Sequence, residues 1–357
     1  MQTNNSSSTE CYVWQVSGTL WISVYHSYLR LFFRVHCSYT MVLVAVGACY
    51  IDTILTTPHY PGEDDKLRAT SILRRRGGNC PNTLEVLKQL VAQTSPGQET
   101  PLSLIAVLPA QTSIASKQIR DAFEPQVSLN HCIYRQNFEE PASSYIIKSQ
   151  ASGSRTIVNY NELPEMKLEE FIQIADKLGT EARWYHFEGR IPDVTLSCMH
   201  HIREHYPSIK ISVEVEKPGR DGLQELAQEA DIVFYSKSWA QANGYRSAKE
   251  CIEKQSSLLD KATLLCCTWG QDGAAALEPR AGNAVHSPAY TPKGFQVVDT
   301  IGAGDTFIAG MLYGLTVKGD AWDLSQKLSI ANRLAGTKVT QEGFNNLGRV
   351  LEPFSDP

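Results

Sequence analysis

The sequence predicts a three-layer α/β/α sandwich with a mostly parallel central sheet and a small β-sheet lid. From Met41 onward, short β-rich runs alternate with segments of helical periodicity. The β-rich runs are apolar throughout, which is typical of parallel strands that helices cover on both faces. Two other regions, about residues 53–76 and 129–160, alternate polar and apolar residues, as antiparallel strands with one solvated face do. We expect these two regions to form the lid.

Six runs are the predicted strands of the central sheet, and four helices are predicted between them. The strands are MVLVAVGA at 41, LSLIAVL at 102, ARWYHFEG at 182, KISVEVE at 210, DIVFYS at 231 and TLLCCTW at 263. The helices are PNTLEVLKQLVAQ at 81, PDVTLSCMHHIREHY at 192, DGLQELAQEA at 221 and SAKECIEKQSSLLDKA at 247. Because ligands in open α/β sheets bind beyond the carboxyl ends of the strands, the residues that follow each strand are the candidates for a site.

Composition and charge restrict the classes of function. The 357 residues are 42% hydrophobic and 20% charged, which is a globular composition. The formal net charge of -5 argues against a surface for nucleic acid or anionic membrane. The nine cysteines are scattered and form no CxxC motif, which indicates buried thiols in a reduced, cytoplasmic protein.

The first forty residues differ from the rest of the chain. A polar start, MQTNNSSSTE, leads into an aromatic-rich segment that arginines and histidines interrupt. This pattern is neither a signal peptide nor a membrane span, although an interfacial amphipathic anchor is an alternative. We predict a poorly ordered appendage over 1–40, one domain over 41–352 and a short tail over 353–357.

The segment DTIGAGDTF places Asp305 where a helix begins, directly after Gly302, Ala303 and Gly304. The unpaired N–H groups and the dipole of a helix N-terminus bind anions, and glycines allow a phosphate to approach closely. A carboxylate there either caps the helix or takes a proton from a hydroxyl that attacks a bound phosphorus. The motif by itself leaves both interpretations open. GxxxxGK[ST], HRD and DFG motifs are missing, which argues against P-loop enzymes and protein kinases.

A second glycine motif, RRRGGNCPN, precedes the first predicted helix. Gly78 belongs to a tight turn, and Asn79 and Asn82 can lie on one side of the first helical turn. Amide side chains offer both donors and acceptors, which suits a polyol, although Asn79 could equally be a helix N-cap. Asp52 follows the first strand, where a ligand of the sheet would lie.

The segment HIREH at 201–205 fits the HxxEH pattern of a class of zinc proteases. His201 and His205 share one helix face, but a zinc site needs a third ligand. We prefer the interpretation of a solvated helix face.

The two glycine motifs resemble the signatures of the ribokinase-like (pfkB) family of carbohydrate kinases. The stretches SGSRTIV, HFEGR, ISVEVEKP and AVHSP extend the likeness over about residues 41–348. The resemblance implies a kinase that uses ATP and Mg²⁺ to phosphorylate a sugar, most closely the members that phosphorylate D-fructose at its 1-hydroxyl. It also implies a possible homodimer that forms through the lid.

The resemblance assigns roles to individual residues. It implies that Asp305 is the general base, that the amides of Gly302, Ala303 and Gly304 form an anion hole, and that Arg155 is a lid arginine near the phosphates. The positions that match sugar-binding residues of the family are Asp52, Asp64, Gly78, Asn79 and Asn82.

Further positions match the nucleotide and metal sites of the family. Lys237, Gly270, Gly273 and Asn332 correspond to nucleotide-binding residues, and Glu216 corresponds to a ligand that holds Mg²⁺ through water. From the residues alone, an exposed lysine, a hairpin turn at QDG and a salt-bridged glutamate remain the alternatives.

The chain departs from the fructose-phosphorylating members at three places. Ser154 precedes Arg155 where those members carry asparagine, the region 91–131 lacks an expected glycine-rich stretch, and Val339 replaces a cysteine. The alternatives are therefore a related kinase for ribose, adenosine or another ketose, and a non-catalytic sensor of sugar or nucleotide on the same fold.

Overall fold

The computed structural model describes residues 14–16, 19–21, 42–94 and 100–354. The chain divides into two compact units, Met1–Tyr39 and Thr40–Pro357. In the first unit, β1 (Trp14–Val16) and β2 (Thr19–Trp21) pair in antiparallel orientation. The rest of the expected appendage over 1–40, and the last three residues of the tail, lie outside the described residues.

The second unit contains the nine-stranded central sheet, in the order β17-β16-β15-β14-β13-β12-β3-β6-β8. Seven strands are parallel, and β16 and β17 extend one edge in antiparallel orientation. The predicted parallel sheet is confirmed. The bounds are β3 (Val42–Val46), β6 (Leu102–Ile105), β8 (Val127–Ser128), β12 (Ala182–Phe187), β13 (Lys210–Val215), β14 (Ile232–Tyr235), β15 (Leu264–Thr268), β16 (Ala274–Glu278) and β17 (Asn283–Ser287).

Helices cover both faces of this sheet, which confirms the three-layer α/β/α sandwich. Each strand sends alternate side chains into two separate cores: Leu43 of β3 lies in one core and Val44 in the other. This explains why the strands are apolar throughout. One face carries α1 (Asn79–Val91), α2 (Ile114–Phe123), α8 (Ala303–Tyr313) and α9 (Leu324–Lys338). The other carries α3 (Leu168–Leu178), α4 (Pro192–His205), α5 (Leu223–Glu229), α6 (Lys237–Ala242) and α7 (Ala248–Ser256).

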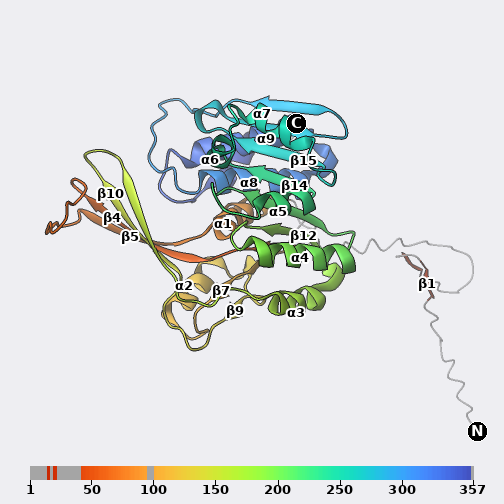
Figure 1. The fold of residues 1–357 in the computed structure, drawn as a ribbon, viewed down its shortest axis with the longest axis horizontal. Helices are drawn as coiled ribbons and strands as arrows, with labels where there is room; N and C mark the ends of the chain where they lie inside the picture. Colours follow the sequence, from red (N-terminus) through yellow and green to blue (C-terminus); the bar gives the residue numbers. More distant parts are fainter. Residues whose placement is uncertain (1–13, 17–18, 22–41, 95–99, 355–357) are drawn as a thin grey trace, which may run out of the picture. The chain divides into compact units, whose positions relative to one another are not determined.

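The predicted lid is a four-stranded sheet that projects from one side of this unit (Figure 1). Its strands are β4 (Tyr50–Thr57), β5 (Ser71–Gly77), β10 (Ser143–Ser149) and β11 (Arg155–Tyr160), in the order β11-β10-β4-β5.

Two details of the lid prediction are wrong. The sheet is mixed rather than antiparallel, because β10 pairs with β4 in parallel orientation. Residues 129–142 lie outside it, since β9 (Ile133–Tyr134) pairs with β7 (Val107–Leu108) instead. The alternation of polar and apolar residues along the sequence predicts each hairpin. It does not predict which strands of the two hairpins pair with each other.

None of the helices in the described part of the chain is long and apolar enough to cross a membrane.

We expect a chain that begins at Met41 to fold as the full chain does, because both cores are built from residues after 41. Its midpoint of thermal unfolding, measured by circular dichroism, should lie within about 2 °C of that of the full chain. Loss of the cooperative transition on truncation would reject the predicted domain organisation.

Candidate active site

A cavity of about 460 Å³ opens at the carboxyl ends of the central strands and faces the lid. This is the edge of the sheet at which a ligand was expected. Several of the predicted site residues line it together although they come from distant parts of the chain. They are Asp52, Gly78, Asn79, Asn82, Arg155, Glu216, Gly302, Gly304 and Asp305.

Asp305 lies in the first turn of α8 but does not cap the helix. The N-cap is Gly302, whose φ of 79° is left-handed and which has no side chain to donate or accept. A Cβ at Gly302 would lie 2.4 Å from the ring of Phe344, so this position also requires glycine on steric grounds. The Asp305 carboxylate instead accepts a hydrogen bond from Asn82 Nδ2 at 2.8 Å, and the residue is only 9% exposed. The capping interpretation is therefore wrong.

The environment of Asp305 opposes its negative charge. Burial raises its pKa well above the usual value, and the neighbouring Glu214, Glu216 and Glu188 act in the same direction. The hydrogen bond from Asn82 acts against this rise. A carboxyl group of this kind is a strong proton acceptor once a nearby cation favours its ionised form.

Three glutamates form an acidic cluster beside Asp305. Asn79 Nδ2 lies 2.7 Å from Glu214 Oε2 and 2.8 Å from Glu216 Oε2, so one amide bridges both carboxylates. Burial, together with the charge of Glu216, raises the pKa of Glu214 to about 8. Burial and Glu214 raise the pKa of Glu188 to about 7. Clustered carboxylate oxygens of this kind are the ligands that a hard divalent cation prefers.

A second group of potential metal ligands, Cys80, His186 and Glu214, does not fit a metal site. Burial raises the pKa of the Cys80 thiol well above its usual value, which disfavours the thiolate that a metal needs. Both ring nitrogens of His186 have partners, since Nδ1 lies 2.9 Å from Ser212 Oγ and Nε2 lies 3.1 Å from Glu214 Oε1. Burial lowers the pKa of His186 to about 3. Cys80 and His186 are therefore neutral buried groups, and His186 positions Glu214.

The first glycine pair allows a carboxylate to lie against the backbone. A Cβ at Gly77 would lie 2.4 Å from Asp52 Oδ1, and a Cβ at Gly78 would lie 2.1 Å from the carbonyl oxygen of Ala48. Gly78 also has a φ of 102°, which favours glycine. Asp52 is 6% exposed, and its Oδ2 lies 3.8 Å from Arg75 Nε. Burial raises the pKa of Asp52, and the charge of Arg75 opposes this rise.

The lid contacts the loop that precedes α8. Arg155 Nη1 on β11 donates a hydrogen bond to Thr300 Oγ1 at 2.9 Å. The guanidinium therefore lies where an anion bound at the N-terminus of α8 would meet it.

Comparison with known proteins identifies the family. The sequence profile of the pfkB family of carbohydrate kinases matches residues 42–348. The chain belongs to the pfkB family of carbohydrate kinases. It is 31% identical to mouse ketohexokinase over 312 residues, which cover 85% of this chain and 98% of that protein. This membership makes the chain a phosphotransferase that acts on sugar hydroxyl groups.

Solved structures of ribokinases share the fold. The Arabidopsis thaliana ribokinase complexed with ribose and ATP superposes with a TM-score of 0.70 at 18% identity, covering 89% of this chain and 100% of that chain. The Cryptococcus neoformans ribokinase in complex with ADP gives a TM-score of 0.63 at 18% identity, covering 88% of this chain and 99% of that chain. The ribokinase-like fold that the sequence predicts is therefore confirmed.

Several predicted site residues of this pfkB kinase do not line the cavity. Asp64 is exposed in the turn before β5 and has a φ of 65°. Asn332 is buried and donates hydrogen bonds to the carbonyl oxygens of Ser287 and Pro288 at 2.8 and 3.3 Å. The amide of Asn332 thus holds the end of β17, so the prediction that it binds nucleotide directly is not supported by its placement. Ala303 is likewise not among the lining residues.

The other predicted nucleotide residues lie near the same edge of the sheet but outside the cavity lining. Lys237 Nζ stands 5.6 Å from the ring centroid of Trp269, a cation–π distance. A Cβ at Gly273 would lie 2.1 Å from the carbonyl oxygen of Ser287, so close approach of the backbone explains this glycine. Gly270 has a φ of 64° and open space around it.

The zinc interpretation of HIREH also finds no support. His201 Nε2 pairs with Asp176 at 2.8 Å, and His205 Nδ1 bonds the carbonyl oxygen of His201. These contacts are those of a helix surface.

Sequence reasoning missed several residues that line the cavity. Lys217 and Arg220 follow Glu216 after β13, and Glu188 and Arg190 follow β12. The rule that singled out Glu216 applies equally to these residues, since all of them follow strands at the carboxyl edge.

We expect Glu188→Gln to stabilise the ligand-free pfkB kinase at alkaline pH. The pKa of Glu188 rises from 4.5 to about 7 on folding, so the folded state holds a proton that the unfolded state has lost. The free energy of unfolding of the wild type should therefore fall as the pH rises from about 4.5 to above 7. Glutamine has no proton to lose in this range, so the variant should not show this decrease. At pH 8.5 the variant should unfold roughly 2–4 °C above the wild type, and the difference should disappear near pH 5.

Glu139→Gln is the matched control, because Glu139 is exposed. An equal rise in the unfolding temperature of both variants at pH 8.5 would show that the change in net charge, rather than the buried cluster, causes the stabilisation.

Proposed function

We propose that this chain transfers the γ-phosphate of ATP to a sugar hydroxyl, with the 1-hydroxyl of D-fructose as the acceptor. The observation that carries the proposal is the position of Asp305. Its carboxylate is buried in a cavity that also contains the glycine-rich N-terminus of α8 and the polar side chains of Asp52 and Asn82. One cavity thus offers a base, an anion site and groups that suit a polyol.

In the proposed mechanism, Asp305 takes the proton from the sugar hydroxyl as its oxygen attacks the γ-phosphorus. A new oxygen–phosphorus bond forms, and the bond to the oxygen that bridges the β- and γ-phosphates breaks, so ADP leaves. The amides of Gly302 and Gly304, which line the cavity, stabilise the charge on the transferred group. The N–H of Ala303 donates to the carbonyl of Thr300 at 3.3 Å instead. Arg155 contributes a positive charge from the lid.

The proposed cofactors are ATP and Mg²⁺. Ribokinases of the same fold have been solved with ATP and with ADP, which supports nucleotide use. The carboxylates of Glu216 and Glu214 supply the oxygen ligands that Mg²⁺ prefers, and their mutual repulsion favours a cation. When bound, Mg²⁺ would neutralise charge on the phosphates.

Fructose is proposed as the acceptor because the curated relative is a ketohexokinase. None of the three departures from that group lies in the cavity lining: Ser154 is exposed and bonds Ser152 Oγ, and among the described residues neither Val339 nor any residue from 83 to 143 lines the cavity. Ribose, adenosine and other ketoses are the competing acceptors. The seven cysteines in the described part of the chain form no disulfide, and six of them are buried, which supports a reducing, cytoplasmic location.

The decisive experiment measures ADP release with Mg²⁺-ATP and fructose, ribose, adenosine or other ketoses, for the wild type and Asp305→Asn. We expect turnover with fructose, reduced 10²–10⁴-fold in the variant, as loss of a general base predicts. Asp323→Asn is the matched control, since Asp323 caps α9 outside the cavity and asparagine also caps helices.

Turnover with another acceptor alone would keep the mechanism and reject fructose. Binding of ATP or sugar without turnover on any acceptor would favour the sensor instead.

We also propose a homodimer that forms through the lid. The lid has one face that is turned away from the cavity, opposite the face that carries the cavity-lining Arg155 and Ile157. By strand register this outer face carries Ile72, Tyr145 and Val158, which are 59%, 48% and 59% exposed. A second copy of the chain would cover this apolar face.

Val158→Lys should therefore halve the mass measured by light scattering if the wild type is dimeric, while Leu258→Lys should not. Leu258 is the matched control because it is 54% exposed and lies beyond the end of α7, away from the lid. A monomeric wild type, or a dimer that survives Val158→Lys, would exclude this interface.

A further inference from the structure

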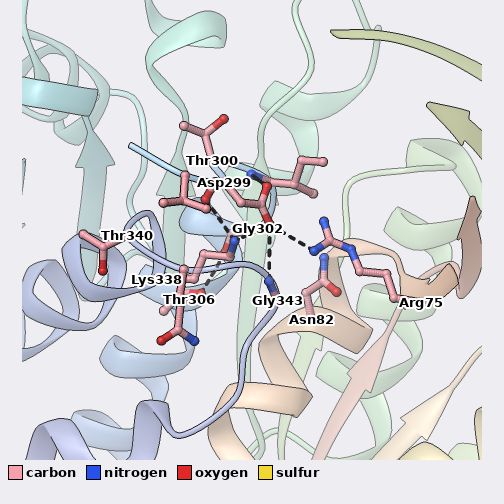
Figure 2. Close-up of polar contacts among 12 residues, drawn as sticks. Arg75, Asn82, Asp299, Thr300, Gly302, Thr306, Lys338, Thr340 and Gly343 are labelled. Atoms are coloured by element: carbon pink, nitrogen blue, oxygen red, sulfur yellow. Dashed lines mark hydrogen bonds and ion pairs between the residues drawn. The ribbon is translucent and has the colours of Figure 1, made fainter. Parts of the chain in front are cut away.

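The loop that leads into α8 is anchored by one carboxylate, that of Asp299. Its Oδ1 accepts a hydrogen bond from the backbone N–H of Ile301 at 2.9 Å. Its Oδ2 pairs with Lys338 Nζ at 2.7 Å and with Arg75 Nη1 at 3.0 Å. Figure 2 shows the two cationic side chains approaching this carboxylate from two sides. Asp299 therefore ties the loop to the end of α9 and to the lid strand β5.

Lys338 is an unusual partner because its side chain is fully buried, with 0% exposure. Its ammonium group also donates a hydrogen bond to the backbone carbonyl of Asp299 at 3.0 Å and lies 5.2 Å from the ring centroid of Phe344. Burying a charged amine costs several kcal/mol unless its partners are well placed. Here one lysine binds both the side chain and the backbone of a single residue.

Backbone hydrogen bonds hold the same segment from the C-terminus of α9. The N–H groups of Val298 and Asp299 both donate to the carbonyl of Val339, at 2.8 and 3.2 Å. The residue after Ile301 is Gly302, where the proposed anion hole begins. Lys338 is thus connected to the phosphate-binding amides through Asp299 and Ile301, although it is not among the residues that line the cavity.

The carboxylate of Asp299 is ionised at neutral pH. Burial opposes its charge, but the hydrogen bond and charge of Lys338, the amide of Ile301 and the charge of Arg75 outweigh burial, so the pKa of Asp299 falls to about 2. Burial lowers the pKa of Lys338, and the hydrogen bond and charge of Asp299 oppose that change. The carboxylate therefore favours the ammonium form of the lysine that faces it.

We propose that Lys338 is a positioning residue which, through Asp299, holds the Gly302–Gly304 amides in the shape that binds the transferred phosphate. The proposal rests on the proposed function and adds two residues to it. Arg75 and Lys338 contact the same Oδ2 of Asp299, but only Lys338 connects this oxygen to α9. Without the lysine, Arg75 remains as the cation on this oxygen, and it stands beside Asp52 on the sugar side. The loop would then lose its charged anchor to α9 and keep only the backbone hydrogen bonds to Val339.

The test is Lys338→Met, a side chain of similar length without charge. We expect kcat to fall roughly ten- to hundredfold, less than the roughly 10²–10³-fold that follows loss of an oxyanion-hole donor itself, because Lys338 acts through Asp299. The KM for the sugar should change little. Binding of a non-hydrolysable ATP analogue, measured by calorimetry, should weaken more than binding of ADP, because only the analogue carries the γ-phosphate. Equal effects on both ligands, or unchanged kcat, would overturn the proposal.

The double variant Lys338→Met, Asp299→Asn separates positioning from simple charge neutralisation. If Lys338 only neutralises a buried carboxylate, the double variant should recover both thermal stability and kcat, and the proposal fails. We expect recovery of stability without recovery of kcat, because the charged anchor of the loop is still missing. This variant also carries the test if the single variant does not fold.

Lys327→Met is the matched control. Lys327 is also a buried lysine of α9, but its side chain packs against Gly314, away from the loop. Its kcat should stay within about twofold of wild type, since no contact with Asp299 is lost. A wild type that phosphorylates no acceptor would reject the proposed function. An active wild type with an unchanged Lys338→Met variant would reject only this inference.

Discussion

The active site depends on the direct contact between the N-termini of two helices, α1 and α8. Asn82 Nδ2 donates to the carboxylate of Asp305 at 2.8 Å, and Thr83 Oγ1 donates to its backbone carbonyl at 3.2 Å. Glycine is required at 302 because of its left-handed φ and because a Cβ there would lie 2.4 Å from the ring of Phe344, whereas the same Cβ would be in ordinary contact with Asn82 Nδ2 at 3.5 Å. The two glycine motifs of the sequence therefore form one contact, although Asn82 and Asp305 are 223 residues apart.

This contact concentrates negative charge in a closed space. Asp305, Glu214 and Glu188 each have a raised pKa, with burial as the largest cause and neighbouring carboxylates as the next. The ligand-free cavity therefore resists full ionisation, and each bound cation should favour the ionised base. The same charges that destabilise the empty site would then strengthen the binding of a metal–nucleotide complex, which stabilises the folded state by mass action.

Charged side chains also connect the lid to the cavity and to the loop that precedes α8. The guanidinium of Arg75 lies 3.8 Å from Asp52 and 3.0 Å from Asp299, so one lid residue joins the proposed sugar side of the cavity to the loop that precedes α8. Arg155 adds a second link from β11, through Thr300. Because both links end on this loop, the placement of the lid and the shape of the proposed anion hole are mechanically connected.

The sequence predicted the parts of this design that depend on local pattern. Apolar strands placed the central sheet correctly. Glycine before Asp305 correctly indicated the turn that opens α8, because a left-handed backbone conformation requires glycine at that position of the sequence. The sequence did not predict the contact of the Asn332 amide with β17, because this contact depends on the docking of α9 against the end of β17, which no local pattern reports. The sequence did not predict the Lys338–Asp299 pair for the same reason. A lysine near a helix C-terminus is normally exposed to solvent and interacts favourably with the helix dipole. Lys338 is buried because α9 packs against the 298–301 segment. Motifs therefore reveal which groups a site contains, whereas tertiary contacts determine which groups hold them in place.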